Sequence, residues 1–145
     1  MDKKQQVELG KLLKFKFKLA GIIILCTCNR TEFYLVNAEK KIDSIITFLE
    51  KYWSISKLRN SLFYAENIEG VRHLLRVASS LESMVLGEPQ ILGQLKSAFK
   101  NFNENGLTGK LLHPLFTRAF STAKKVRTQT TIADNAVSIS YAAVE

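Results

Sequence analysis

The sequence has few of the residues that cross-link or interrupt small proteins. Its 145 residues include 2 cysteines, 2 histidines, 2 prolines and 7 glycines. Two cysteines cannot form the multi-bridge framework of small secreted domains, and Cys26, inside an apolar run, is expected to pack in the core. Together with His73 and His113, the cysteines show no recognisable zinc-ligand spacing. We therefore expect a domain held by its hydrophobic core, with no disulfide and no metal.

Long hydrophobic runs are also missing. No apolar run approaches the roughly 20 residues that a membrane helix needs, and residues 22–26 are far too short. The lysine-rich start lacks the apolar core of a signal peptide. A hydrophobic content of 46% is enough for one sizeable core, with a second small helical unit beside it. We expect a cytoplasmic protein without membrane contact.

Acidic residues are scarce compared with basic ones. The 13 Asp and Glu against 21 Lys and Arg give a net charge of +8. The surplus lies in two basic zones. One is the opening 18 residues, and the other is residues 105–133, which contain no acid and include Lys110, Arg118, Lys124, Lys125 and Arg127. A polyanion such as a nucleic acid would suit these zones, although a solvated basic face explains the charge equally well.

Most of the chain has the apolar spacing of helices. Residues 7–19 start with helical spacing and then alternate lysine with apolar residues, which predicts a short helix followed by an extended link. Residues 40–53 predict another helix, and residues 62–65 predict a short strand. From Ile68 onward the spacing is helical throughout, in three stripes separated by glycine and proline.

Two β-branched runs, residues 21–26 (GIIILC) and 32–37 (EFYLVN), predict a pair of strands. Asn29 in the short gap between them favours a tight reversal, so Cys28 and Arg30 are expected at a hairpin tip. Arg30 is a permanent cation, and a neighbouring cation favours the nucleophilic thiolate form of a cysteine. On this local context alone, however, a small structural cysteine at a strand end is the favoured interpretation of Cys28.

Two further stretches carry polar residues that suit a binding site. His73 falls away from the apolar stripe of its predicted helix, where it is either a solvated histidine or a proton carrier facing a cleft. Residues 86–94 (LGEPQILGQ) contain an acid, Glu88, directly before Pro89, and this pair suits a helix start. Gln90 and Gln94 follow on one helical face. They are either exposed glutamines or a grip for a small polar substrate.

Three blocks of the sequence together resemble the glutamyl-tRNA reductase family in order and content. They are ILCTCNRTEFYLV, VRHLLRVASSLESMVLGEPQILGQLKSAF and FTRAFSTAKKVRTQTTIADNAVSISYAAVE, and they cover roughly residues 21–145. The TCNRTE and LGEPQILGQ elements are too specific for a chance match. With this resemblance, Cys28 becomes the expected nucleophile.

The resemblance implies an activity. That family converts glutamyl-tRNA to glutamate-1-semialdehyde with NADPH, an oxidoreductase reaction that begins tetrapyrrole (porphyrin) synthesis from glutamate. The position of Cys28 implies attack on the aminoacyl ester to give a glutamyl thioester, which hydride then reduces after the tRNA has left. The position of His73 implies a catalytic residue, to which we assign proton transfer to the leaving ribose oxygen.

The resemblance also implies which residues of this chain contact the substrate. Arg30 would bind the free side-chain carboxylate of the glutamyl group in a bidentate fork, and Glu88 or Gln94 would receive the α-ammonium. Glutaminyl-tRNA would lose the ion pair with Arg30, which predicts discrimination against it. The full set of expected substrate contacts is Thr27, Cys28, Asn29, Arg30, Ser83, Glu88, Pro89, Gln90 and Gln94.

The implied fold is α+β, a ferredoxin-like sheet followed by a helical extension. Residues 1–67 are expected to form the α/β part of the catalytic domain, residues 68–137 its helical part, and residues 138–145 the start of a linking helix. The family's usual first strand, with an N-H-K-T-x-P element, has no counterpart in the opening residues MDKKQQVELGKLLKF. The family's NADPH-binding and dimerisation domains are expected beyond Glu145, so this chain should acylate or hydrolyse without reducing.

Glutamyl-tRNA is the expected partner of the basic zones, through its acceptor end and its ribose-phosphate backbone. For full-length members of the family, the resemblance implies two further partners. They are a second copy of the chain, bound through a C-terminal domain to form a homodimer, and the next enzyme of the pathway. A rival interpretation is a tRNA-binding module that has kept the basic surface and lost turnover. A purely structural interaction domain would leave the TCNR element, His73 and LGEPQ without a purpose.

Overall fold

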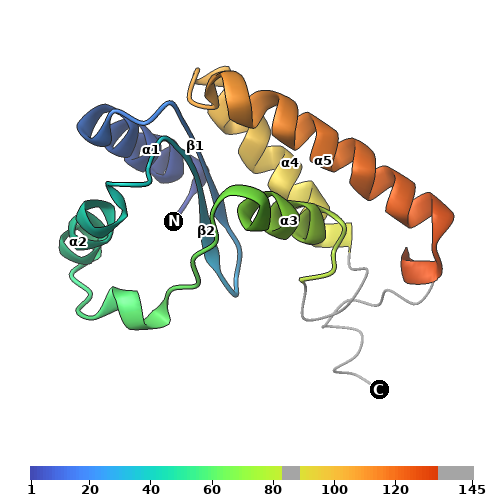
Figure 1. Ribbon diagram of the computed structural model, residues 1–145, viewed down its shortest axis with the longest axis horizontal. Helices are drawn as coiled ribbons and strands as arrows, with labels where there is room; N and C mark the ends of the chain where they lie inside the picture. The colour runs from blue at the N-terminus through green and yellow to red at the C-terminus, as the bar shows by residue number, and fades with distance from the viewer. Residues whose placement is uncertain (83–88, 134–145) are drawn as a thin grey trace.

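The computed structural model describes residues 1–82 and 89–133, in which a two-stranded antiparallel sheet lies between two groups of helices (Figure 1). The expected α+β class is confirmed. One group of helices is α1 (Lys3–Phe17) and α2 (Ile42–Trp53); the other is α3 (Asn67–Ala78), α4 (Pro89–Glu104) and α5 (Gly109–Gln129). Two short 3-10 helices are η1 (Leu58–Ser61) and η2 (Thr131–Ala133). The sheet pairs β1 (Gly21–Cys26) with β2 (Thr31–Val36), in register from Gly21 opposite Val36 to Cys26 opposite Thr31.

The strand β1 is the centre of the core. Residues 21–25 are all buried, because helices cover both faces of the hairpin, and this explains the unbroken apolar run. Successive residues of β2 point to opposite faces. Phe33 packs on Trp53 of α2, with ring centroids 6.0 Å apart, while Tyr34 packs on Phe116 of α5 at 5.1 Å. The sheet therefore joins the two groups of helices.

The first helix is longer than its sequence pattern predicted. Most of residues 7–19 belong to α1, so the extended link expected there is wrong. A capping box fixes the start of the helix: the Asp2 carboxylate accepts from the Gln5 N–H at 2.8 Å, and the Gln5 side chain accepts from the Asp2 N–H at 2.9 Å. Leu9 and Leu13, one turn apart, are fully buried. Lysine and leucine are good helix formers. The buried stripe therefore favours a helix more strongly than the alternation of lysine with apolar residues favours a strand.

The short strand expected at residues 62–65 is also wrong. These residues form an irregular segment between η1 and α3, and the sheet of the described residues consists of β1 and β2. Strand propensity is realised only where a partner edge and a packing surface are present. Leu62, Phe63 and Tyr64 are instead exposed to solvent.

The other predicted elements that fall within the described residues are confirmed. The hairpin, the helix at residues 40–53 and three helices in the second half are present, and α4 begins at Pro89 as its sequence suggested. Residues 138–145, where the linking helix was expected, lie outside the described residues. In residues 1–82 and 89–133, no helix is long and apolar enough to cross a membrane.

The connection between α4 and α5 packs closely against the start of β1. The Ile22 N–H donates to the Leu107 carbonyl at 2.9 Å. A Cβ atom added to Gly109 would lie 2.2 Å from the Ala20 carbonyl oxygen, and the φ of Gly109 is +65°. Only glycine accommodates both this contact and this backbone conformation. The contact attaches the helical half of the chain to the sheet.

We expect Gly109→Ala to lower the free energy of unfolding more than Gly106→Ala. Both glycines have a positive φ, +65° and +67°, so both substitutions carry the cost of left-handed backbone, about 1 kcal/mol. A Cβ at Gly106 meets nothing within 4 Å, whereas at Gly109 it meets backbone. Urea unfolding followed by circular dichroism measures both losses. Equal losses would contradict the close packing at Gly109.

Candidate functional site

The turn between β1 and β2 is held by Thr27. Its N–H donates to the Arg30 carbonyl at 2.9 Å, and its Oγ1 accepts from the N–H groups of Asn29 at 3.2 Å and Arg30 at 3.1 Å. A threonine hydroxyl can fix a turn through such bonds to the backbone. Cys28 and Asn29 lie at the exposed end of the turn, and Cys28 is a free thiol. The predicted hairpin tip is confirmed.

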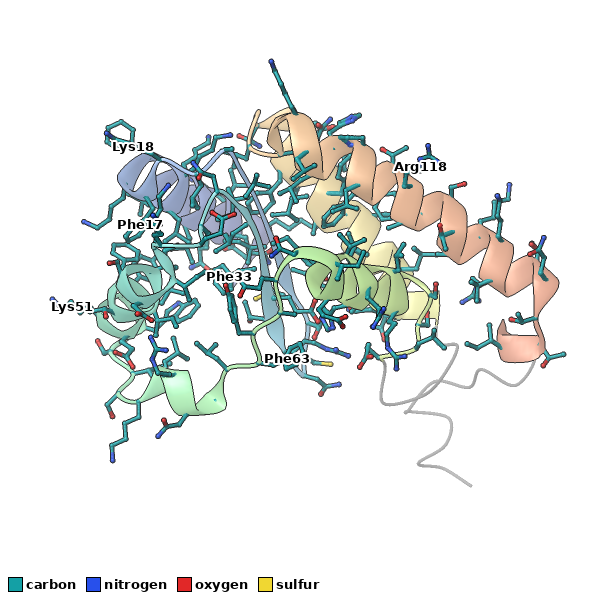
Figure 2. All side chains as sticks on the ribbon, in the orientation of Figure 1. Phe17, Lys18, Phe33, Lys51, Phe63 and Arg118 are labelled. Carbon is teal, nitrogen blue, oxygen red and sulfur yellow. The ribbon has the colours of Figure 1, made fainter. Side chains whose placement is uncertain are left out.

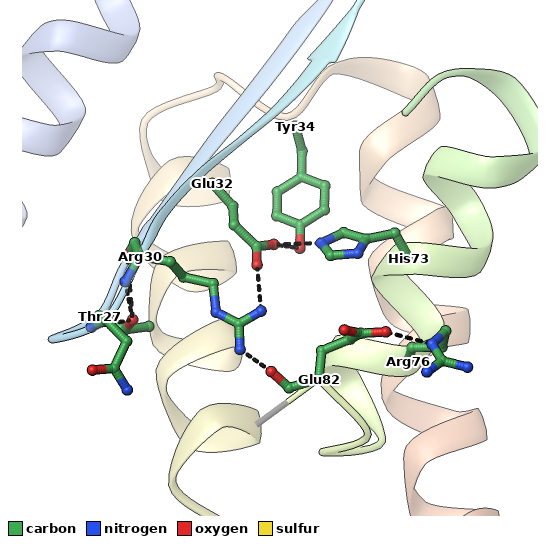
Figure 3. Close-up of polar contacts among 8 residues, drawn as sticks. Thr27, Arg30, Glu32, Tyr34, His73, Arg76 and Glu82 are labelled. Carbon is green, nitrogen blue, oxygen red and sulfur yellow. Dashed lines mark hydrogen bonds and ion pairs between the residues drawn. The ribbon is translucent and has the colours of Figure 1, made fainter. Parts of the chain in front are cut away.

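A polar cluster centred on Glu32 lies next to the turn (Figure 3). Glu32 Oε1 accepts from Arg30 Nη1 at 3.3 Å. Its Oε2 accepts from the Tyr34 hydroxyl at 2.5 Å and lies 3.2 Å from Nε2 of His73 in α3. The Glu32 side chain is only 13% exposed, and a carboxylate that is so buried needs several donors. Glu32 therefore joins the hairpin to α3.

The contact with Glu32 determines which nitrogen of His73 carries the proton. An ionised carboxylate can only accept, so Nε2 donates, and Nδ1 of the neutral ring is left as the acceptor. A carboxylate also orients the general base of Ser-His-Asp enzymes, but there it accepts from Nδ1 and leaves Nε2 as the base. Phe63 lies against the His73 ring, with centroids 5.7 Å apart. The histidine is half-buried and held in place, unlike the solvated histidine considered from the sequence.

Tyr34 supplies a permanent donor to this cluster. Burial raises the pKa of Tyr34 far above its usual range, and the negative charge of Glu32 raises it further. The phenol is therefore protonated at neutral pH, and it donates to Glu32.

The cluster extends to the segment that follows α3. Arg30 Nη2 donates to the carbonyl oxygen of Glu82, and the Glu82 carboxylate accepts from Arg76 Nε at 2.5 Å. The hydrogen bond from Arg76 lowers the pKa of Glu82, and it outweighs the opposing effect of partial burial. Arg30 thus bridges the hairpin and the segment that leads toward α4.

The two glutamines lie elsewhere. Gln90 and Gln94, on the first turns of α4, line an open groove of about 390 Å³ together with Cys26. Its other lining residues are Lys3, Gln6, Leu25, Gly93, Ser97, Ala98 and Asn101. Among the described residues, the lining does not include Cys28 or the Glu32 cluster. The structure thus brings Arg30 and His73 together through Glu32, and the glutamines together at the groove.

The cysteine expected in the core is only partly buried. Cys26 lines the groove, and its Sγ lies 3.1 Å from Thr31 Oγ1. It ends a strand whose preceding five residues are buried, so the apolar run stops short of it. Ser83 and Glu88, and the side chain of Pro89, lie outside the described residues.

Sequence reasoning missed Glu32 and Tyr34. A signal for them existed, because alternate residues of a strand share a face and Arg30 was already a candidate. Residues 30, 32 and 34 follow that period of two, and all three join the cluster. The partner His73, 41 residues further on, could not be paired with Glu32 from spacing alone.

In residues 1–82 and 89–133, no group of three or more His, Cys, Asp and Glu side chains could hold a metal ion. For NADPH, the turn after β1 does not fit a Rossmann-type dinucleotide site. β1 leads into an antiparallel hairpin through the TCNR turn, whereas that type of site has a glycine-rich turn between a strand and a helix.

The chain is a small α+β domain in which a free thiol lies at the tip of the hairpin whose Glu32 holds the imidazole of His73. The chain belongs to the family of the glutamyl-tRNA reductase N-terminal domain, whose model ("Glutamyl-tRNAGlu reductase, N-terminal domain") matches residues 1–130. The family expected from the TCNRTE and LGEPQILGQ elements is confirmed.

Individual relatives agree with this family. The chain is 50% identical over 123 residues to the glutamyl-tRNA reductase of Pseudomonas savastanoi pv. phaseolicola, and 48% identical over the same length to that of Marinobacter nauticus. Each match covers 83% of this chain and 29% of the relative. The solved glutamyl-tRNA reductase from Methanopyrus kandleri superposes with a TM-score of 0.80 at 32% identity, over 99% of this chain and 36% of that one. The chain therefore spans about a third of the length of these relatives.

We expect Arg76→Gln to raise the pKa of Glu82 toward its ordinary value. The pKa of Glu82 is lower in the folded chain than in the unfolded chain. The pair with Arg76 therefore stabilises the fold above the unfolded pKa, and this stability is lost as the pH falls through the folded pKa. NMR titration of the Glu82 side chain measures the change.

Arg72→Gln is the matched control for this titration. Arg72 lies one turn earlier in α3 and pairs with Glu69 at 3.0 Å, so its replacement should leave the pKa of Glu82 unchanged. An unaltered titration of Glu82 in Arg76→Gln would show that Arg76 is not the cause of the shift.

Proposed function

We propose that this chain performs the acylation step of a glutamyl-tRNA reductase, in which the glutamyl group passes from its tRNA to Cys28 as a thioester. The observation that carries the proposal is the exposed Cys28 thiol in the turn beside Arg30, in a chain of this family. Reduction to glutamate-1-semialdehyde, for tetrapyrrole synthesis, would use NADPH. We assign NADPH binding and homodimer contacts to the parts of the longer relatives that this chain does not match.

In the proposed step, the Cys28 sulfur attacks the carbonyl carbon of the glutamyl ester. A C–S bond forms, the ester C–O bond breaks, and its electron pair stays with the terminal ribose oxygen of the tRNA. His73 Nδ1 takes the proton from the thiol and passes it to that oxygen, so protons balance. Glu32 holds the ring and offsets the positive charge that the imidazole gains.

Arg30 is the proposed ligand for the side-chain carboxylate of the glutamyl group. Its bonds to Glu32 and to the Glu82 carbonyl fix the guanidinium in position. A guanidinium has five N–H donors, so these two bonds leave capacity for the substrate. A neutral glutaminyl side chain would not form this ion pair, so the site would select glutamyl-tRNA over glutaminyl-tRNA. The family resemblance adds the following as proposed contacts: Thr27, Asn29, Ser83, Glu88, Pro89, Gln90 and Gln94.

The helix α5 offers a surface for the tRNA backbone. It has five basic side chains and no acidic one in 21 residues, and it runs along the outer edge of the helical group (Figure 1). Figure 2 labels one of these basic residues, Arg118. Phosphate contacts of this kind give salt-sensitive binding that is independent of sequence. The same observation favours the second candidate function, a tRNA-binding module without turnover.

Glutamyl transfer to Cys28 tests the proposal. The chain is mixed with glutamyl-tRNA in the absence of NADPH, and protein mass and peptides are analysed by mass spectrometry. We expect a glutamyl adduct on the wild-type chain that is absent from Cys28→Ser. The matched control, Cys26→Ser, should retain the adduct, because it removes the neighbouring thiol and leaves the turn unchanged.

Identical behaviour of the wild type and Cys28→Ser would refute acyl transfer. A binding titration with tRNA at two salt concentrations would then test the second candidate. Affinity that falls steeply with salt would support a tRNA-binding module, and negligible affinity at both concentrations would exclude it.

A further inference from the structure

An exposed apolar segment precedes α3, and one of its residues, Phe63, contacts His73. Five of the exposed large hydrophobic side chains fall between residues 55 and 68, and they are Ile55, Leu62, Phe63, Tyr64 and Ile68. Phe63 is 78% exposed, although its ring contacts the imidazole of His73. Exposed apolar groups gathered next to a reactive site mark a place where something binds.

We propose that Phe63 is a stacking platform for the terminal nucleobase of the aminoacyl-tRNA. The inference rests on the proposed acyl transfer, because the glutamyl ester is carried by the ribose of the last nucleotide. If His73 protonates that ribose oxygen, the attached base must lie one sugar away from the imidazole. An aromatic ring at that place offers what single-stranded bases bind best, a flat apolar face.

The contacts around Phe63 suit this role. Its ring is inclined by 46° to the His73 ring, whose Nε2 is held by Glu32, so the imidazole supports Phe63 from one side. The large exposed fraction leaves the rest of the ring to solvent. Tyr64, the next residue, is held differently, since its hydroxyl donates to Glu66 at 2.9 Å.

A protein partner or a second copy of the chain could also cover an apolar segment. The position of Phe63 favours the base over either of these. A protein seated on Phe63 would also cover the edge of His73, and the imidazole must remain open to the ribose for acyl transfer to occur. A base arrives with the ribose itself, so it occupies the platform only when the ester is in place.

Three glutamyl esters distinguish the base from the rest of the tRNA. They are glutamyl-tRNA, 3′-O-glutamyl-adenosine, which keeps only the terminal nucleoside, and glutamyl methyl ester, which has no base. The rate of Cys28 acylation by each is measured on the whole chain. Phe63→Ala should lower the rate constant at low substrate by about tenfold for both esters that carry a base, and should leave the methyl ester unchanged.

Two further variants control the measurement. Phe63→Trp keeps a stacking face and should retain the wild-type rates with all three esters. Phe15→Ala makes the same substitution at a phenylalanine that is 89% exposed on α1, and it should change none of the rates. Circular dichroism of each variant tests whether it is folded.

Two results would overturn the platform. The first is a wild-type acylation rate of Phe63→Ala with 3′-O-glutamyl-adenosine. The second is an equal loss of acylation rate with all three esters, which would make Phe63 only a support for His73. In both cases the wild-type chain still acylates, so the proposed function survives. Failure of the wild type with every ester would contradict the acyl transfer and the platform together.

Discussion

The pairing of one buried carboxylate, Glu32, is the interaction on which the rest of the site depends. The cost of removing its charge from water is offset only while Arg30, Tyr34 and His73 all donate to it. Two of these donors lie on the hairpin and the third on α3, 41 residues away. Satisfying one carboxylate therefore brings the hairpin and α3 into one arrangement and selects the donating nitrogen of His73.

The fold supplies a rigid support for this arrangement. β1 is buried on both faces, and the helical half is attached to it at Gly109, where the backbones approach too closely for a side chain. The Cys28 thiol, in contrast, lies in an exposed turn that Thr27 holds by its own hydrogen bonds. A mobile substrate can thus reach Cys28, while the groups that would handle its proton and carboxylate stay fixed.

Local sequence signals predicted the parts of the fold that are decided locally. Two β-branched runs around Asn29 gave the hairpin, and helical spacing gave the helices of the second half. The extended link expected within α1 was wrong, because the alternation in LLKFKFKL imitates a strand while Leu9 and Leu13 bury a helical stripe. The segment at residues 62–65 has strand propensity but pairs with no strand in the described part. The contact between Glu32 and His73 depends on tertiary packing, which no spacing reveals.

The acylation rate of Glu32→Gln tests the account most directly. This substitution keeps the shape of the side chain, removes its charge, and replaces one acceptor oxygen by an NH2 donor, which must face either Arg30 or the pair of His73 and Tyr34. The account predicts that Cys28 acylation by glutamyl-tRNA falls by about a hundredfold, the usual contribution of a positioned proton carrier, while exposed Glu39→Gln stays at the wild-type rate. A folded Glu32→Gln chain that acylates as fast as the wild type would contradict the central role of Glu32.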